Sequence, residues 1–540
     1  MSSALLPELT ACLGPGGAST RQEDRMVYAR DMWPRGLLAV AASVRPTELP
    51  EVVVWPQQTA QVQQVVHLCR RHRVPLVPFG AGSGVCGGAV ARGGVVMDLK
   101  RMRRVLAIDP ERSTVTFEPG ILGTHLEGAL ARHGLTLGHF PSSIMCSTAG
   151  GWLATRSAGQ CSTRYGKIED MVQEVELVAG TGEVLVLRGD EPGLPDLLQL
   201  AVGSEGTLGI ITRATCAVRR APQARCMRGW SFPWVQAACE GIRRVLQHGL
   251  RPAVVRIYDE LDTLMSGQRR RALARAPAEG ASEQVALEPG LERWLEVLRP
   301  DMQRARRGLQ RWLVSRALAR PQLLNRMAGQ LVPRLAPGCM LIVGFEGEAA
   351  VAEAEERAAA QDLLAAGGHD LGPGPGEHWL AHRYDISFQM PKAYAAGAFV
   401  DTLEVAADWE RLLPLYEAVR EAVSAHALVM AHFSHAYPDG CSIYFTFAAR
   451  RQGGLPGTGP EALEADERRY DALWQTALQA VVRAGGTISH HHGIGRLKAP
   501  FMHAEHGRGM ALYRALKAVL DPDGILNPGK MGLDGPAEAL

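Results

Sequence analysis

Paired cysteines, long hydrophobic runs and a charge imbalance are all missing from this sequence. Its 540 residues include only 10 cysteines, and no two of them form a C-x-x-C pair. Scattered cysteines are typical of reduced thiols in a cytosolic protein. No stretch of about 20 apolar residues exists, so we expect no membrane-spanning helix. The first residues lack the basic start and apolar run of a signal peptide, which predicts a cytoplasmic protein, soluble or peripherally attached to a membrane.

The charge balance argues against nucleic acid as a partner. Lys and Arg total 58 and Asp and Glu total 56, so the formal net charge is only +2. A nucleic-acid binder usually concentrates basic residues on one surface. Hydrophobic residues make up 46% of the chain and charged residues 21%. This is an ordinary globular composition, and the length allows two or three domains.

Hydrophobic periodicity predicts an α+β fold. In the first half we expect a helix at 60–72, with Thr59 as its N-cap, and short strands at 51–56, 75–79, 94–99, 105–108 and 114–119. The last two strands are predicted to form an antiparallel pair. Beyond residue 224 we expect helices at 234–248 and 409–425, strands at 254–257 and 340–345, and surface loops at 276–290 and 450–460.

A glycine-rich turn directly after a predicted strand is the first candidate binding segment. Closely spaced glycines let successive backbone N–H groups point at one anion, as in a phosphate-binding nest. The pattern is not G-x-G-x-x-G at a strand–helix junction, so a Rossmann site is disfavoured. A turn without a ligand is the alternative. The residues are Pro78, Phe79, Gly80, Ala81, Gly82, Ser83 and Gly84.

Two further segments are rich in small residues. The first could admit a planar ring against the backbone and offer hydroxyl donors, although a tight packing corner is the alternative; it comprises Ser142, Ser143, Ile144, Met145, Cys146, Ser147 and Thr148, then Thr155, Arg156, Ser157 and Ala158. The second is a glycine-punctuated turn that enters a strand, with Glu205, Gly206, Thr207, Leu208, Gly209, Ile210 and Ile211.

These segments, in this order, resemble the PCMH-type FAD domain of the vanillyl-alcohol-oxidase superfamily. The resemblance implies that the glycine turn holds the pyrophosphate, the second segment borders the isoalloxazine and the third closes over the adenosine side. The ending from Leu520 to Met531, including Asn527, matches the C-terminal signature of the same oxidases. Neither Cys86 nor His139 lies in a covalent attachment motif, so non-covalent FAD is implied.

Three adjacent histidines, His490, His491 and His492, form the next candidate site. Neighbours in sequence point in different directions, so one ion could rarely bind all three, and no metal is predicted. Beside a flavin, imidazoles can shuttle protons or hold an oxyanion. The alternative is one structural and two exposed histidines. Tyr444, in a predicted strand, is a second candidate, with simple core packing as its alternative.

The histidine segment Ser489–Gly495 and the strand Asp439–Phe447 resemble alkylglycerone-phosphate synthase, and so do Tyr28–Pro34 and Gly150–Arg156. In that family the tyrosine that matches Tyr444 takes a proton from the carbon beside the substrate ketone, and the three histidines are essential. The resemblance implies a transferase that exchanges the acyl chain of acylglycerone phosphate for a fatty alcohol in ether-lipid biosynthesis. We expect an imidazolium or N–H donor of this tract to stabilise the Tyr444 phenolate.

The dehydrogenases of D-lactate and D-2-hydroxyglutarate share the fold and are the nearest alternative. Their metal ligands lie in G-D-G-N-L-H and E-H-G-I-G, where this chain has Ile443 and His491. The synthase family carries a phosphate-binding arginine where this chain has Met390, so Arg383 and Lys392 are the candidate substrate-binding residues. Ser142 also replaces an aspartate of the animal synthases. A flavin oxidoreductase of a hydroxy acid, glycerol phosphate or another alcohol therefore stays open, as does a silent flavin- or lipid-binding protein.

The resemblance divides the chain into an N-terminal helical segment (1–48), a PCMH-type FAD-binding domain (49–222), a cap domain with an antiparallel sheet covered by helices (223–446) and a C-terminal FAD-contacting segment (447–533). Residues 299–326 carry eight arginines and one acid. That composition suits a helix at an anionic membrane surface, or else a solvated helix on the cap. The expected partners are a small amphipathic lipid substrate, a membrane surface and a second copy in a homodimer.

Overall fold

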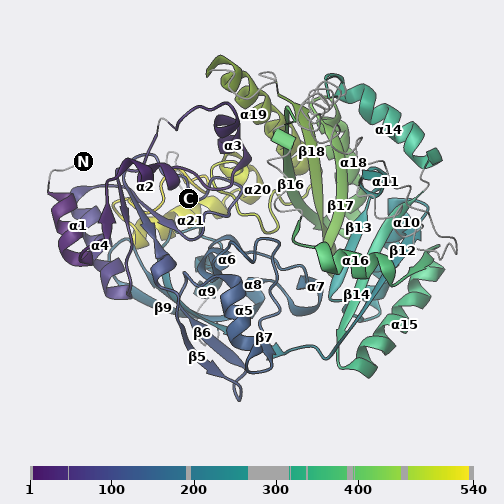
Figure 1. The fold of residues 1–540 in the computed structure, drawn as a ribbon, viewed down its shortest axis with the longest axis horizontal. Helices are drawn as coiled ribbons and strands as arrows, with labels where there is room; N and C mark the ends of the chain where they lie inside the picture. The colour runs from purple at the N-terminus through teal and green to yellow at the C-terminus, as the bar shows by residue number, and fades with distance from the viewer. Residues whose placement is uncertain are drawn as a thin grey trace, which may run out of the picture.

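The computed structural model describes residues 4–46, 48–189, 196–265, 316, 318–335, 338–385, 393–394, 396–451 and 460–533. Figure 1 shows two lobes side by side, with the earlier half of the chain (purple to blue) on the left and a large sheet of later strands (teal to green) on the right. Both lobes combine strands with helices, which confirms the predicted α+β fold.

A four-stranded sheet of order β1-β2-β4-β3 begins the left lobe. Strands β2, β4 and β3 are parallel, and every residue of β2 and β4 is buried, as expected for a parallel sheet covered on both faces. The elements are α1 (Leu5–Leu13), β1 (Ala18–Ser19), α2 (Gln22–Val27), α3 (Pro34–Ala41), β2 (Val52–Val54), α4 (Thr59–His72), β3 (Leu76–Phe79) and β4 (Val95–Asp98). The glycine-rich turn follows the carboxyl end of β3.

A second, antiparallel sheet of order β5-β6-β10-β8-β9 completes this lobe. Its strands are β5 (Val105–Asp109), β6 (Thr114–Phe117), β8 (Val172–Val178), β9 (Val184–Arg188) and β10 (Ile210–Ala217). Its helices are α5 (Gly123–Ala131), α6 (Ala149–Thr155), α7 (Ser162–Tyr165), α8 (Ile168–Met171) and α9 (Leu197–Ala201). Two short strands, β7 (Leu135–Thr136) and β11 (Arg219–Arg220), pair with each other.

The right lobe is built on a seven-stranded antiparallel sheet of order β15-β12-β14-β13-β17-β18-β16. Its strands are β12 (Ala224–Phe232), β13 (Val254–Tyr258), β14 (Cys339–Gly347), β15 (His369–Gly372), β16 (Ala398–Asp408), β17 (Leu428–Ala436) and β18 (Gly440–Arg450). The helices of this lobe are α10 (Val235–Gln247), α11 (Glu260–Met265), α14 (Pro321–Leu335), α15 (Ala349–Ala365), α16 (Gly374–His382), α18 (Trp409–Ser424) and α19 (Pro460–Arg483).

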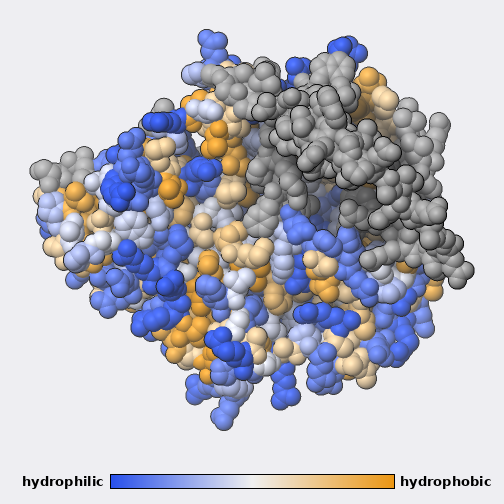
Figure 2. All heavy atoms as spheres, viewed as in Figure 1, coloured by the Kyte–Doolittle hydropathy of each residue, from blue (hydrophilic) through white to orange (hydrophobic). Residues whose placement is uncertain are grey.

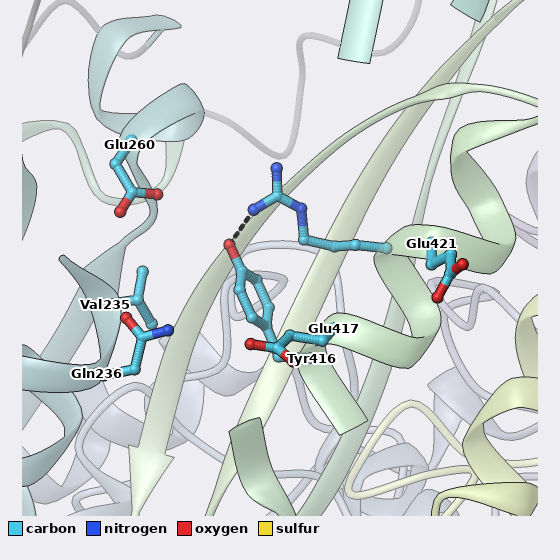
Figure 3. A pocket seen from close by; sticks show the side chains of 7 residues that line it. Val235, Gln236, Glu260, Tyr416, Glu417 and Glu421 are labelled. Atoms are coloured by element: carbon cyan, nitrogen blue, oxygen red, sulfur yellow. Dashed lines mark hydrogen bonds between the residues drawn. The ribbon is translucent and has the colours of Figure 1, made fainter. Parts of the chain in front are cut away.

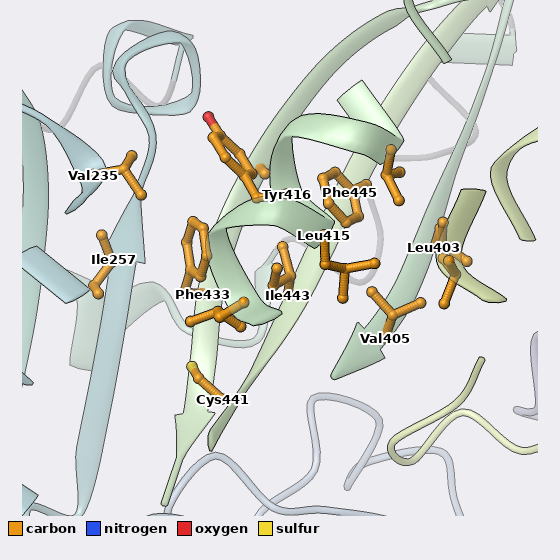
Figure 4. Close-up of a cluster of buried hydrophobic side chains, with 14 of the residues drawn as sticks. Val235, Ile257, Leu403, Val405, Leu415, Tyr416, Phe433, Cys441, Ile443 and Phe445 are labelled. Atoms are coloured by element: carbon orange, nitrogen blue, oxygen red, sulfur yellow. The ribbon is translucent and has the colours of Figure 1, made fainter. Parts of the chain in front are cut away.

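The two faces of this large sheet have different roles. One face packs its apolar side chains under α18, where Phe433, Ile443 and Phe445 meet Leu415 and Tyr416 (Figure 4). Because side chains alternate along a strand, the residues between these apolar ones point to the opposite face. That opposite face packs against the left lobe, since Tyr258, Met340 and Ile342 share a core with residues of β6, β8 and β10.

The last part of the chain returns to the left lobe (Figure 1). After α19, Thr487 bridges to Ala406 of β16, and the histidine tract follows directly. Helices α20 (Met502–His506) and α21 (Gly509–Leu520) then lead to Leu526, which bridges to Leu76 of β3. The histidine tract is therefore held between the two lobes.

Most elements expected from the sequence are present, with bounds that shift by at most two residues. Thr59 is a correction: α4 begins at Thr59 itself, its N-cap is Gln58, and the Thr59 hydroxyl donates to Glu176 at 2.9 Å. The loop at 276–290, most of the basic stretch at 299–326 and most of the loop at 450–460 lie outside the described residues. None of the described helices combines the length and apolar composition needed to cross a membrane. On the face in Figure 2, hydrophilic side chains predominate at the left and lower rim, with apolar ones between them.

Candidate active site

The three glycine-rich segments, far apart in sequence, meet at the end of β3. A Cβ on Gly80 would lie 2.5 Å from the Thr148 hydroxyl oxygen, so the first and second segments are in contact. A Cβ on Gly206 would lie 2.3 Å from Pro78 Cγ, so the third segment packs against the first. Gly82 and Gly206 have φ values of +67° and +73°, which favour glycine. A close-packed glycine backbone with these φ values is the arrangement of a phosphate-binding nest, as expected for the pyrophosphate of FAD.

Glu205 ties this region to the histidine tract. Its carboxylate accepts hydrogen bonds from the backbone N–H groups of Ile494 and of Gly495, the latter at 2.9 Å. The Asn527 amide donates to the backbone oxygens of Glu205 at 2.7 Å and Gly88 at 3.0 Å, while its buried Oδ1 has no partner among the described residues. That oxygen is left for a ligand, and the predicted C-terminal signature thus meets the third segment as FAD binding needs.

The side chains at 155–157 bond to the protein itself. Thr155 donates to the Gly151 carbonyl at 3.0 Å, and Arg156 donates to the Val202 carbonyl at 3.0 Å. Ser157 bonds to the ring of His139 at 3.1 Å, and that ring packs against Trp152. The role of these three residues in binding the cofactor stays a prediction.

Tyr444 lies at the centre of a row of polar side chains, the polar row, made of Glu404, Tyr444 and His432 with Arg256 beside His432. The row is on the face of the large sheet that meets the left lobe, called the FAD lobe because it carries the segments expected to bind FAD. In the strand register Tyr444 is directly opposite Glu404 of β16 on one side and His432 of β17 on the other. Its neighbours Ile443 and Phe445 point into the core of the other face (Figure 4). The His432 ring stacks on Tyr444 with centroids 4.7 Å apart. Alternation along the strand therefore places the tyrosine ring in the site, not in the core.

A chain of close polar contacts runs from Tyr444 through His491 to Glu404. The Tyr444 hydroxyl contacts His491 Nε2, and His491 Nδ1 lies 3.2 Å from a carboxylate oxygen of Glu404. Since a carboxylate can only accept, Nδ1 carries the proton and Nε2 has a free lone pair for the phenol O–H. The same carboxylate accepts from the backbone N–H of His491 and, at 3.0 Å, of His492.

Glu404 is a fully buried charge that is compensated by Lys498. The ammonium lies 3.2 Å from the carboxylate, and both side chains have no exposed surface. Burial alone would raise the pKa of Glu404, but Lys498 and the backbone N–H donors hold it below its ordinary value. Glu404 is therefore an ionised acceptor that fixes the orientation of the histidine tract.

Burial keeps the histidines neutral, which corrects the imidazolium part of the expectation for Tyr444 and leaves the N–H donor part a prediction. Burial lowers the pKa of His490 and of His492 to about 4, and that of His491 well below 6.5. Burial also raises the pKa of Tyr444 well above its ordinary value, Glu404 raises it further, and the Arg256 guanidinium opposes both. The resting site thus holds a neutral phenol that donates to a neutral imidazole.

His490 offers a free N–H to the site. Its Nδ1 lies 2.9 Å from His491 Nδ1, which already carries a proton, so His490 Nδ1 accepts and its Nε2 carries the proton. His490 Nε2 is buried and has no partner in the part of the chain that the structure describes. A buried N–H without a partner costs about 1–3 kcal/mol, so a ligand oxygen is expected there.

Sequence reasoning missed four further polar residues of the site. His435, at a β-bulge with φ +54°, lies 3.5 Å from the Tyr444 hydroxyl through Nε2 and 2.8 Å from the Ser162 hydroxyl through Nδ1. Glu404, Arg256 and His432 complete the set. The available signal was a charged or polar residue between apolar ones in a strand, as in Leu403-Glu404-Val405 and Val255-Arg256-Ile257.

Of the predicted substrate residues, only Arg383 lies within the described part of the chain. It follows α16, with its guanidinium 5.6 Å from the Phe140 ring and 4.8 Å from the Tyr384 ring, and its carbonyl accepts from Gln160 at 3.3 Å. Gln160 also donates to Ser142 at 3.2 Å, so Arg383 borders the second glycine-rich segment. Lys392 and Met390 lie outside the described residues.

Glu404, His490 and His491 have ligand atoms within 4.8 Å of one another, close enough for a metal ion. Both carboxylate oxygens of Glu404 are already hydrogen-bonded, and the Lys498 ammonium would repel a dication at 3.2 Å from one of them. A hydrogen-bonded relay describes these contacts better than a metal centre.

A surface pocket of about 460 Å³ lies elsewhere, between α10, α11 and α18 (Figure 3). Tyr416 lines it and stacks on Phe433 and Phe445, so the pocket is on the helix-covered side of the sheet. Its charged lining residues are mainly acidic: Glu260, Glu417 and Glu421, with Arg420. The sheet separates this pocket from Tyr444.

Comparison with known proteins supports FAD at this site. Residues 50–188 match the model of an FAD binding domain, and residues 221–531 match that of the C-terminal domain of FAD linked oxidases. The chain belongs to the FAD-linked oxidase family. Its cofactor is FAD and it is an FAD-dependent enzyme, as the sequence resemblance predicted.

Relatives of this FAD-linked oxidase include two alkyldihydroxyacetonephosphate synthases. That of Trypanosoma brucei brucei is 28% identical over 525 residues, which are 94% of this chain and 76% of the relative. That of Dictyostelium discoideum is 29% identical over 496 residues, 89% of this chain and 73% of the relative. A glycolate oxidase subunit of Bacillus subtilis is 25% identical over 530 residues, 97% of this chain and 96% of that protein.

A solved alkyldihydroxyacetonephosphate synthase superposes with a TM-score of 0.73 at 26% identity, covering 98% of this chain and 85% of the other. A p-cresol methylhydroxylase with bound substrate gives a TM-score of 0.67 at 16% identity over 98% and 96% of the two chains, which shows the fold alone. The resemblance found in the sequence is thereby confirmed.

Proposed function

We propose that this FAD-linked oxidase is a transferase that exchanges the acyl chain of acylglycerone phosphate for a fatty alcohol. The observation that carries the proposal is the chain from Tyr444 through His491 to Glu404, because it equips a phenol to accept a proton from carbon. The names of the synthase relatives support the same reaction. Ile443, where the metal-dependent dehydrogenases carry a histidine ligand, points into the core (Figure 4), which argues against their chemistry.

FAD would be held by the glycine turn at 80–84, the segment 142–148, the turn at 205–207 and Asn527. When bound, the oxidised flavin supplies an electron sink that makes the substrate carbon beside the ketone easier to deprotonate. The fit rests on the close-packed glycines and on the free Asn527 oxygen.

Tyr444, His491 and Glu404 carry out the proton transfer. As the Tyr444 oxygen takes the proton from the substrate carbon, its own O–H proton moves to His491 Nε2. Glu404 stabilises the imidazolium that forms at Nδ1, so no free phenolate with a depressed pKa is needed. The His490 Nε2–H can donate to the departing carboxylate oxygen. The fatty alcohol oxygen then bonds to the same carbon, and the alcohol proton leaves with the released carboxylate as fatty acid. Tyr444 returns the first proton to the carbon, and His491 returns the phenol proton to Tyr444, which restores the relay.

The test is incubation of the holoenzyme with acylglycerone phosphate and a labelled fatty alcohol, followed by lipid analysis. We expect label in an ether-linked glycerone phosphate, one fatty acid released per ether formed, and no net reduction of the flavin. Absence of labelled ether lipid with FAD fully bound would contradict the proposal.

The glycolate oxidase relative and the Met390 position favour a second candidate, a dehydrogenase of a hydroxy acid. That reaction leaves the flavin reduced. Anaerobic mixing with glycolate, D-lactate and glycerol phosphate, followed by absorbance of the oxidised flavin, distinguishes the two. Rapid bleaching by one of these compounds would favour the dehydrogenase over the transferase.

A further inference from the structure

We infer that Arg256 is the anion-binding residue of this active site and takes the phosphate monoester of the substrate. The inference rests on the proposed function for the identity of the anion. It would give the site a phosphate partner, since the sequence resemblance leaves Met390 where an arginine is expected.

Arg256 lies within the polar row around Tyr444. It is on β13, next to β17 in the sheet (Figure 1), directly opposite Ser434 and two pairs from the Tyr258–His432 pair, on the same face. Its Nη2 donates to His432 Nε2 at 2.7 Å, and the His432 ring stacks on Tyr444. A group bound to Arg256 is thus one ring away from the proposed base.

The guanidinium has an unused donor. Nη2 is used by His432, but the buried Nε has no hydrogen-bond partner among the described residues. A guanidinium binds phosphate through two parallel N–H groups, so an edge with an unused donor suits that ligand. The Ser434 and Ser442 hydroxyls, paired across β17 and β18 on the same face, are also buried without partners and can complete the anion's hydrogen bonds.

Among the described residues, Arg256 has no carboxylate partner of the kind that other arginines of this sheet have. Arg225 pairs with Glu346 at 2.6 Å, and Arg228 pairs with Glu356 at 2.6 Å and Asp370 at 2.7 Å. Among the described residues no carboxylate forms such a pair with Arg256; the Asp262 carboxylate lies on the far side of His432, 3.4 Å from its Nδ1. A half-buried cation among neutral imidazoles is costly without an anion, which the substrate supplies.

Binding of glycerol phosphate, compared with glycerol, to the FAD holoenzyme tests the inference without requiring turnover. The readouts are the flavin difference spectrum and the ligand-induced rise in Tm. We expect wild type to bind glycerol phosphate and not glycerol. Arg256→Gln should weaken glycerol phosphate binding by about 10- to 100-fold, the worth of charge-assisted hydrogen bonds. Arg256→Lys, which keeps the charge but not the fork, should fall between the two.

Arg228→Gln is the matched control, an arginine of the same sheet with its own carboxylate partners, and it should bind as wild type does. FAD content checks that each variant is folded; if Arg256→Gln loses FAD, the Arg256→Lys value decides. Unchanged glycerol phosphate affinity in the Arg256 variants, or a loss in Arg383→Gln alone, would overturn the inference. The proposed function could fail while the inference holds. In that case the enzyme would show no transferase activity but would still bind glycerol phosphate through Arg256.

Discussion

The hydroxyl of Tyr444 and Nε2 of His491 are in hydrogen-bonding contact although 47 positions separate them in the chain. The contact exists because β18 presents Tyr444 to the FAD lobe, while Glu404 of the adjacent strand holds the histidine tract by its backbone and by His491 Nδ1. The proposed removal of a proton from the substrate carbon depends on this pair.

Replacing the proposed base should abolish turnover but not cofactor binding. In Tyr444→Phe the ring keeps its stacking on His432, and only the hydroxyl is lost, so stability should change by less than about 1.5 kcal/mol. Turnover should fall by about 10²- to 10⁴-fold, the range for a positioned base. Steady-state rates, FAD absorbance and Tm measure the three effects. A variant with near wild-type turnover would reduce Tyr444 to a packing residue.

Glu404→Gln should impair catalysis and stability together. The amide cannot stabilise the imidazolium of His491, and Lys498 is left as an uncompensated buried charge, which costs about 3–5 kcal/mol. The double variant Glu404→Gln, Lys498→Met should recover most of the stability but not the rate. Denaturant unfolding and turnover separate the two roles. The exposed Glu410→Gln is the control; equal effects at both sites would remove Glu404 from the relay.

The neutral histidines predict a pH-dependent stability. Burial holds the pKa of His490 at about 4, below the 6.5 of the unfolded chain. Between these values the unfolded state takes up a proton that the folded state refuses, so wild type loses stability as the pH falls through this window. His490→Gln should not show this loss. The unfolding free energy of the variant minus that of wild type should therefore rise by roughly 3 kcal/mol as the pH falls from 7 to 4. The exposed His133→Gln should show no such trend; a flat difference for His490→Gln would mean that the ring is not held neutral.

The glycine turn should not tolerate a side chain. At Gly82 the φ is +67° and a Cβ would lie 2.5 Å from the Phe79 ring, so Gly82→Ala should lower FAD occupancy of the purified protein. Gly128, inside α5, has no atom within 4 Å of its virtual Cβ and no positive φ, so Gly128→Ala should bind FAD normally and be slightly more stable. Full flavin content in Gly82→Ala would place the cofactor elsewhere.

The fold and the central residues could be predicted from the sequence because their signals are local. Periodicity located the helices α10 and α18, and the glycine segments with the C-terminal signature indicated FAD. The partners of Tyr444 could not be predicted the same way. Glu404, Arg256 and His435 reach it through strand register and a β-bulge, which depend on the whole sheet. Neutral histidines likewise follow from burial that only the packed lobes create.

Exchange of the substrate proton tests the central claim most directly. Acylglycerone phosphate labelled with deuterium at the carbon between the ester oxygen and the ketone is incubated with holoenzyme in ordinary water without fatty alcohol. The relay predicts loss of deuterium to solvent in wild type, and exchange at least about 10²-fold slower in Tyr444→Phe with the same FAD content. Equal exchange rates in the two proteins would contradict the assignment of Tyr444 as the base.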